Sequence, residues 1–229
     1  MKNKNIVFEA KRYWSSVATP APAVGLPDVS RFANNGTFNG SVAWLRLPSG
    51  LWITNHYGAA AGDYIRILDA PSILDVPRFT WIAWIYPIGW GGFAIGAIID
   101  KGARTLYISG GANTWLEFFQ SFAGNQGNWN TPVGSMALNR WFQVALTYDS
   151  TNVANDPLLY INGVSQVVTE SSIPAGAIDS DLGVNLKIGN SAANRTFLGY
   201  ILPVLFAWHI FTPGQIRDDF EEKRHWVGI

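Results

Sequence analysis

The sequence contains no cysteine and few charged residues, and both absences narrow what the chain can be. Without cysteine, disulfide bonds and thiolate zinc sites are excluded. Charged residues make up 14% of the 229 residues, against roughly 25% in an average soluble domain. Because 16 basic residues balance 16 acidic ones, no global field attracts nucleic acid or an anionic membrane, and we expect neither as a partner.

Long apolar runs are also missing. No stretch approaches the ~18 uninterrupted apolar residues that a membrane span needs. Residues 1–9 contain no apolar run like that of a secretory signal. We therefore expect the protein at the surface of a virus particle or, otherwise, in the cytoplasm.

Apolar and aromatic residues are abundant instead. Hydrophobic residues make up 48% of the chain, which is enough for a sizeable core, and eleven residues are tryptophan. So many tryptophans leave some at a surface, where they bind partners or sugars. Together with the few charges, they indicate a surface partly covered by other chains, so we expect a homo-oligomer.

Turn-forming residues divide the chain into two parts. Within residues 1–30, Pro20, Pro22 and Pro27 favour an extended backbone, which predicts an N-terminal arm. From residue 31 to residue 229, short apolar runs alternate with Gly, Asn, Asp and Pro, as in a single sandwich or barrel domain.

Several apolar runs predict strands. Residues 141–148 alternate with period two, and residues 79–86 are apolar on both faces, as in a strand covered on both sides. Asn162-Gly163 between two apolar runs predicts a tight hairpin, because both residues tolerate positive φ. Shorter predicted strands are residues 63–68, 95–100, 105–109, 115–119 and 185–188.

One short helix is predicted near the C-terminus. Thr212 is a good N-cap, Pro213 suits the first helical position, and Gln215 has the spacing of a capping box. Ile216 and Phe220 would face the sandwich. The acidic residues would face water: Asp218, Asp219, Glu221 and Glu222.

Seven segments in order resemble the motifs of laminin-G-like, concanavalin A-like lectin/glucanase jelly-roll domains. They are residues 34–40, 62–67, 79–87, 98–102, 139–149, 159–163 and 186–189. The resemblance covers roughly residues 30–222 and implies an all-β fold: an antiparallel two-sheet jelly-roll sandwich with the extended N-terminal arm and the short C-terminal helix. These motifs specify a fold and leave the function open.

The chain departs from the family pattern after Gly199. Positions that usually carry charged residues are Leu202, Pro203 and Leu205 here. An outward apolar face of this kind predicts a subunit interface, formed by Ile201, Leu202, Pro203, Leu205 and Trp208. The alternative is that the N-terminal arm folds back over it. Pro203 also predicts a sheet edge or a bulge.

The final segment, residues 212–229, resembles the tails of such domains in phage-encoded particle proteins. The first functional hypothesis is therefore a non-catalytic structural protein of a phage particle, such as a capsid decoration or tail-associated protein, with other virion subunits as partners. The alternative is a free carbohydrate-binding module or lectin that binds surface glycans.

Residues 123–131 predict the carbohydrate site, because a tryptophan among amides suits a sugar face and its hydroxyls. The candidates are Trp129, Asn128 and Asn125, with Trp90 and Trp115 on the same surface. Alternatively, Trp129 packs over a sheet edge or into a neighbouring subunit.

No catalytic pattern is present in the sequence. Glycosidases of the family place two or three carboxylates on one strand, and none of the five glutamates here has that spacing. No Gly-x-Ser-x-Gly elbow occurs, and the three histidines lie far apart in the sequence. We therefore expect no enzymatic activity and no required cofactor.

Calcium is the ion that the resemblance implies, because relatives hold it through Asp, Asn and loop carbonyls. The candidate ligands are Asp149, Asn152 and Asp156, which cluster in one loop. The alternative is that these side chains only satisfy the backbone of a turn.

Overall fold

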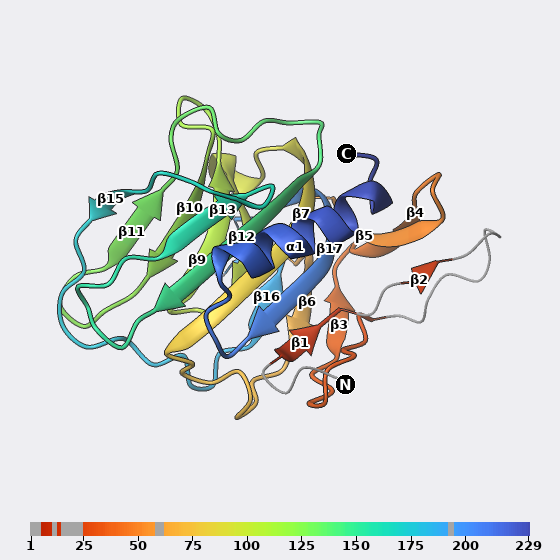
Figure 1. The fold of residues 1–229 in the computed structure, drawn as a ribbon. Helices are drawn as coiled ribbons and strands as arrows, with labels where there is room; N and C mark the ends of the chain where they lie inside the picture. Colours follow the sequence, from red (N-terminus) through yellow and green to blue (C-terminus); the bar gives the residue numbers. More distant parts are fainter. Residues whose placement is uncertain (1–5, 11–12, 15–24, 58–61, 192–194) are drawn as a thin grey trace.

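The computed structural model describes residues 6–10, 13–14, 25–57, 62–191 and 195–229, which form two facing antiparallel β-sheets (Figure 1). This architecture confirms the predicted sandwich. The order of the first sheet is β14 (Val164–Ser165), β13 (Leu158–Ile161), β12 (Phe142–Asp149), β7 (Arg78–Gly89), β17 (Leu198–Ala207), β5 (Leu51–Tyr57) and β2 (Tyr13–Trp14). In addition, β1 (Ile6–Glu9) pairs with β17, and β4 (Ala43–Arg46) pairs with β5.

The second sheet faces the first across the core. Its order is β15 (Thr169–Ser172), β11 (Gly127–Asn130), β10 (Trp115–Gln120), β9 (Arg104–Ser109), β8 (Ile95–Asp100), β16 (Leu186–Ile188), β6 (Tyr64–Ile67) and β3 (Gly36–Asn39). The helical elements are η1 (Gly92–Ala94), α1 (Pro213–Lys223) and η2 (Arg224–Trp226). Within the described part of the chain, no helix has the length and apolar character needed to cross a membrane.

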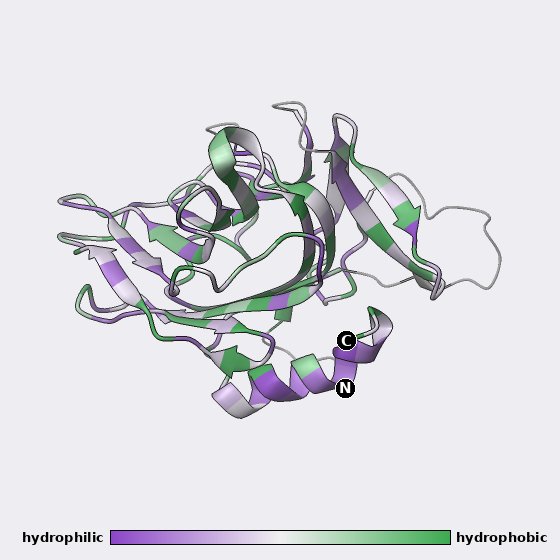
Figure 2. Ribbon diagram, turned by 90° about the horizontal axis from the view of Figure 1, so that it is seen from above, coloured by the Kyte–Doolittle hydropathy of each residue, from purple (hydrophilic) through white to green (hydrophobic). Residues whose placement is uncertain are grey.

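Strand β7 is buried on both faces, as its sequence predicts. Its inward residue Trp81 belongs to the core between the sheets, whereas Ile82 belongs to a smaller cluster on the other face. Helix α1 covers that second face: Ile216 is fully buried against it, and the Phe220 ring stacks on Trp84 at 5.7 Å between ring centroids. Figure 2 shows α1 as a largely hydrophilic ribbon lying outside the first sheet.

The C-terminal helix begins as predicted. The Thr212 hydroxyl accepts a hydrogen bond from the Gln215 amide, and the Gln215 side chain accepts one from the Thr212 amide, which completes the capping box. The prediction that Asp219 faces water was wrong. Its carboxylate accepts a hydrogen bond of 2.9 Å from the buried Gln143 side chain of β12 and pairs with Lys223, because this face of the helix lies on the sheet.

The predicted hairpin at Asn162-Gly163 is confirmed. Both residues have positive φ, 52° and 76°, which matches the twist of the two strands that they connect. A Cβ on Gly163 would lie 3.1 Å from the Cβ of Phe220, so the turn also lets α1 approach closely.

The predicted subunit interface along β17 is covered by the chain itself. Ile201 and Leu202 point into the core between the sheets, and Leu205 is buried in the cluster beneath α1. Strand β1 of the arm pairs with β17, so the described part of the arm contains strands and packs on its own sandwich. This is the alternative considered for the apolar face, and it leaves these three side chains unavailable to a second subunit.

The two remaining residues of that predicted interface differ. Half-buried Trp208 packs on Phe32 with ring centroids 5.0 Å apart and donates a hydrogen bond of 2.6 Å from Nε1 to the Ser72 carbonyl. The side chain of Pro203 lies outside the described residues. The register of β17 against β7 shifts between Ile201 and Val204, which confirms the predicted bulge.

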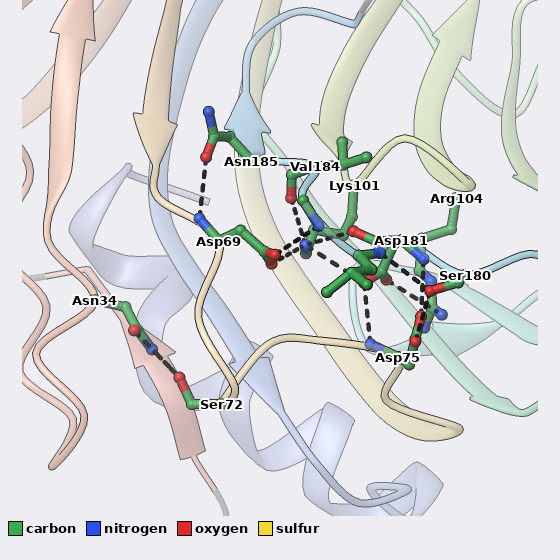
Figure 3. A network of polar contacts seen from close by, with 12 residues as sticks. Asn34, Asp69, Ser72, Asp75, Lys101, Arg104, Ser180, Asp181, Val184 and Asn185 are labelled. Atoms are coloured by element: carbon green, nitrogen blue, oxygen red, sulfur yellow. Dashed lines mark hydrogen bonds and ion pairs between the residues drawn. The ribbon is translucent and has the colours of Figure 1, made fainter.

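A buried ion network closes one end of the second sheet (Figure 3). The Lys101 ammonium lies 2.6 Å from Asp69 Oδ1 and 3.4 Å from Asp181 Oδ1, and it also donates to the carbonyls of Asp181 and Val184. Arg104 Nη2 lies 3.4 Å from Asp181 Oδ2. The exposed fraction is only 1% for the Lys101 and Asp181 side chains, so each charge depends on its partners.

Removing the Lys101 ammonium is expected to destabilise the fold strongly. In Lys101→Met, Asp181 keeps only Arg104 as a counter-ion, and we expect a loss of about 3–5 kcal/mol in the free energy of unfolding, measured by urea denaturation at pH 7. The matched control is Arg78→Met, which breaks an ion pair whose Arg78 side chain is 59% exposed. That variant should lose less than about 1 kcal/mol. Equal losses in the two variants would contradict the role of the buried network.

A second buried titratable group is His56 on β5. Its Nε2 lies 3.1 Å from Thr54 Oγ1, and its Nδ1 has no hydrogen-bond partner among the residues that the structure describes. The ring lies against Gly189, where a Cβ would come within 2.1 Å of Nδ1. Complete burial lowers the pKa of His56 from 6.5 to about 3, so the folded protein holds the neutral imidazole.

Because of His56, the free energy of unfolding should decrease as the pH is lowered. Its folded pKa is below its unfolded value of 6.5, so its contribution is complete above pH 6.5 and is lost as the pH falls toward 3, by about 1.4 kcal/mol per pH unit. Urea denaturation between pH 7 and pH 4 should give a shallower decline for His56→Gln than for the wild type. The exposed His225→Gln is the control and should keep the wild-type slope. Identical slopes for His56→Gln and the wild type would refute the prediction.

Candidate functional site

The outer face of the second sheet, on the side away from the first sheet, carries polar and aromatic side chains. Strand alternation sends Leu106 of β9 and Phe118 of β10 into the core. The neighbouring Tyr107, Glu117 and Phe119 therefore point outward. The register pairs Tyr107 with Glu117, which places both side chains in one row across the two strands.

A polar cavity of about 320 Å³ lies on this outer face. The sheet supplies its floor, and three connecting segments contribute to its walls: the turn between β8 and β9, the loop before β11 and the segment between β16 and β17. The lining residues are Asp100, Gly102, Thr105, Tyr107, Phe119, Gln126, Asn128, Ser191 and Arg195. This polar cavity combines aromatic rings, amides, hydroxyls and charges, which is the usual make-up of a small-ligand site.

Glu117 organises one side of the face. Its Oε2 accepts a hydrogen bond of 2.9 Å from Trp115 Nε1, and its Oε1 accepts one of 2.8 Å from the Asn128 amide. Both carboxylate oxygens therefore hold neighbouring side chains in place. The amide nitrogen of Asn128 is used in this way, whereas its carbonyl oxygen has no hydrogen-bond partner among the described residues.

Two buried polar atoms at the polar cavity have no protein partner. Among the described residues, neither Ser191 Oγ nor Asn128 Oδ1 has a hydrogen-bond partner. Ser191 is only 8% exposed, so its hydroxyl has little access to bulk water. An unsatisfied buried group costs about 1–3 kcal/mol, and a ligand hydroxyl that reaches it would recover that cost.

Burial sets the charge states at the polar cavity. Burial, and then the negative charge of Glu117, raise the pKa of Tyr107, so its phenol remains neutral and can donate a hydrogen bond. Burial also raises the pKa of Asp100, while the hydroxyl of Thr105 and the charges of Lys187 and Arg195 oppose that effect. Asp100 Oδ1 accepts a hydrogen bond of 2.6 Å from Thr105 Oγ1, which directs this carboxylate toward its own sheet.

The prediction that Trp129 is an exposed sugar platform was wrong. Its side chain is fully buried, lies 5.9 Å from the Phe118 ring in a stacked arrangement, and donates a hydrogen bond of 2.8 Å to Asp156. Residues 127–130, expected to lie within a loop, form β11, and its register against β10 points residue 129 inward. The alternative placed Trp129 over a sheet edge or in a neighbouring subunit, whereas the side chain belongs to the core between the two sheets.

The other four predicted binding residues are only partly brought together. Asn128 lines the polar cavity, and Trp115 joins it through Glu117. Asn125 lies on the loop beyond β10, where its side chain donates to the Ile173 carbonyl. Trp90 lies against the backbone of Gly110, where a Cβ would come within 2.1 Å of the indole.

Sequence reasoning missed Tyr107, Phe119, Ser191 and Arg195. The alternation along β9 and β10 contained the signal for the first two, because it separates Tyr107 and Phe119 from the core residues between them. No local sequence pattern indicates that Ser191 or Arg195 belongs to the site. Their segment reaches the polar cavity because the Arg195 carbonyl accepts a hydrogen bond from Ala97 of β8.

The three predicted calcium ligands do not converge on a shared point. Asp149 is bonded by Arg78 and Thr151, Asn152 by the Ala154 amide, and Asp156 by Trp129. Each side chain thus satisfies a partner within the protein, as turn residues do. Over the described ranges, no group of three His, Cys, Asp or Glu side chains is placed to hold a metal ion. Calcium binding by this loop stays an untested prediction.

Solved structures with the same fold include toxin and carbohydrate-related domains. The binding domain of Paraclostridial Mosquitocidal Protein 1 has a TM-score of 0.71 at 13% identity, covering 95% of this chain and 52% of that one. The receptor-binding domain of botulinum neurotoxin type G has a TM-score of 0.64 at 12% identity, covering 96% of this chain and 51% of that one. This chain therefore spans about half the length of these two toxin domains.

A third structure matches almost end to end. Domain 4 of AbnA, a GH43 extracellular arabinanase from Geobacillus stearothermophilus solved in complex with arabinotriose, has a TM-score of 0.61 at 16% identity. The match covers 92% of this chain and 98% of that domain. At such identities the similarity shows a shared fold alone. No curated protein matches the sequence.

The sequence itself identifies the family. A family model described as the concanavalin A-like lectin/glucanases superfamily matches residues 59–217, more than half of the chain. That range contains β6 to β17, and therefore both the central strands of the two sheets and the floor of the polar cavity. The chain belongs to the concanavalin A-like lectin/glucanase superfamily and has its lectin-like sandwich fold.

Proposed function

We propose that the chain is a non-catalytic saccharide-binding module whose ligand lies in the polar cavity on the outer face of the second sheet. The observation that carries this proposal is the pair of unsatisfied polar atoms, Ser191 Oγ and Asn128 Oδ1, at a cavity large enough for a sugar ring. Sugar hydroxyls both donate and accept hydrogen bonds, so they suit a serine hydroxyl and an amide carbonyl oxygen alike.

The aromatic residues support the same ligand class. Tyr107 and Phe119 line the polar cavity, and Trp115 lies beside Glu117 on the same face. An aromatic side chain offers an apolar surface to the C–H groups of a sugar, and Tyr107 adds a polar tip. The arabinotriose complex of the arabinanase domain supports the saccharide class at the level of the fold.

The carboxylates of the face support binding without hydrolysis. Glycosidases place two carboxyl groups within about 5–10 Å of each other on either side of the scissile bond. Here Asp100 on β8 and Glu117 on β10 are separated by β9, and the register places Asp100 in line with Phe119, two residues from Glu117. Their backbones are therefore about 12 Å apart at ordinary strand dimensions. In addition, Glu117 is occupied by Trp115 and Asn128, and Asp100 is hydrogen-bonded to Thr105.

The structure removes one of the observations that supported the phage-particle hypothesis. That hypothesis drew on the resemblance of residues 212–229 to the tails of phage-encoded particle proteins and on an outward apolar face along β17. The second of these no longer supports it, because Ile201, Leu202 and Leu205 are buried by the chain itself. Within the described residues, no other observation favours virion partners or a homo-oligomer over saccharide binding. We therefore place the saccharide-binding module first.

Binding should depend on the amide that faces the polar cavity. On an immobilised oligosaccharide array the wild type should retain at least one saccharide. By isothermal titration calorimetry with that saccharide, Asn128→Ala should weaken binding about tenfold, because one hydrogen bond and the support of Glu117 are lost.

The matched control is Asn152→Ala, which removes an exposed asparagine from the loop after β12. It should bind like the wild type. A blank array at millimolar saccharide, or an unchanged affinity of a correctly folded Asn128→Ala, would refute the proposed site.

The protein should not hydrolyse the saccharides that it binds. After prolonged incubation with a retained oligosaccharide, chromatography should show the starting material alone, because no second carboxyl group is positioned opposite Glu117. Product formation that Glu117→Gln abolishes, with the Glu117→Gln fold intact by circular dichroism, would show that the module is an enzyme.

A further inference from the structure

Three half-buried cations lie on the outer face beside the polar cavity. Arg66 of β6 and Lys187 of β16 are outward residues that lie opposite each other in the register of these neighbouring strands. Lys187 also lies opposite Asp100 in the register of β16 and β8. Arg195 lines the polar cavity itself. We name Arg66, Lys187 and Arg195 the cationic edge.

In the described part of the chain, no carboxylate lies within ion-pair distance of the cationic edge. Among the described residues, none of its three side chains forms an ion pair within 4 Å. Two of them lie over aromatic rings instead. The Lys187 ammonium is 5.3 Å from the centre of the Tyr64 ring, and the Arg195 guanidinium carbon is 5.8 Å from that of Tyr107.

Two carboxylates share the face and partly offset these charges. Asp100 lies between Lys187 and Arg195, but it is 3% exposed and bonded to Thr105. Glu117 is 8% exposed, and both of its oxygens are used by Trp115 and Asn128. Three cations against two buried, hydrogen-bonded carboxylates leave the accessible part of the face positive.

We propose that the polar cavity binds an anionic saccharide, one that carries a carboxylate or sulfate group. This inference rests on the proposed function and names its ligand class. Arg195 receives the anionic group, because a guanidinium offers two parallel donors to a planar or tetrahedral oxyanion. Lys187 and Arg66 extend the positive surface for the next charged sugar along the chain.

The experiment compares saccharides of equal length and different charge. Isothermal titration calorimetry in 20 mM salt uses trigalacturonic acid, the neutral galactotriose, and a 6-O-sulfated galactotriose. The last carries sulfate and no carboxylate, so it distinguishes the two anionic groups. At least one anionic saccharide should bind ten or more times more tightly than galactotriose. Raising the salt to 300 mM should remove most of that advantage.

Substitutions assign the effect to the cationic edge. Arg195→Gln should weaken binding of the anionic saccharide about tenfold more than it weakens any binding of galactotriose. Arg195→Lys should recover part of the loss, because it restores the charge without the paired donors. The control is Arg217→Gln, which removes an exposed cation from α1 and should change neither affinity.

The outcomes separate this inference from the proposed function. If galactotriose binds as tightly as the acidic saccharides, the anionic class is wrong and the saccharide-binding module stands. If anionic saccharides bind but a folded Arg195→Gln binds equally well, the assignment to the cationic edge is wrong. If the array and all three calorimetric probes are blank, the proposed function and this inference both fail.

Discussion

The buried ion network at the turn between β8 and β9 is the constraint on which the polar cavity depends. Lys101 and Arg104 belong to this network, and their neighbours in sequence, Asp100 and Thr105, line the polar cavity. The turn therefore satisfies buried charges on one side and presents a binding surface on the other. An unpaired ion in the interior would cost several kcal/mol, so the segments that carry Asp69 and Asp181 are held firmly against the strands.

Because side chains alternate along each strand, the second sheet has an apolar inner face and a polar outer face. Trp129 and Asn128 are adjacent in sequence, yet Trp129 fills the core and Asn128 faces the polar cavity. The same rule gives Phe118 to the core and Glu117 and Phe119 to the outer face. On the first sheet, part of the outer face is occupied by α1 instead.

Much of the fold was predictable because its signals are local. The two-sided apolar pattern of β7, the positive-φ hairpin at Asn162-Gly163 and the capping box at Thr212 each depend on a few neighbouring residues. The candidate site was less predictable. Asn128 and Trp115 were identified from composition, but a tryptophan among amides has the same local sequence whether it is exposed or, like Trp129, buried.

The sequence by itself determined the class of fold, the positions of the central strands and which residues of a strand share a face, because period two and turn chemistry act within one segment. Only the tertiary structure decided what covers each face. It paired β1 with β17 and packed α1 against the face that carries Leu205, so this residue is not available for the predicted interface. It also brought Ser191 and Arg195 beside β9, β10 and β11, whose residues lie more than sixty positions earlier in the chain. Burial depends on which elements pack together, and that pairing is set by contacts between residues far apart in the chain.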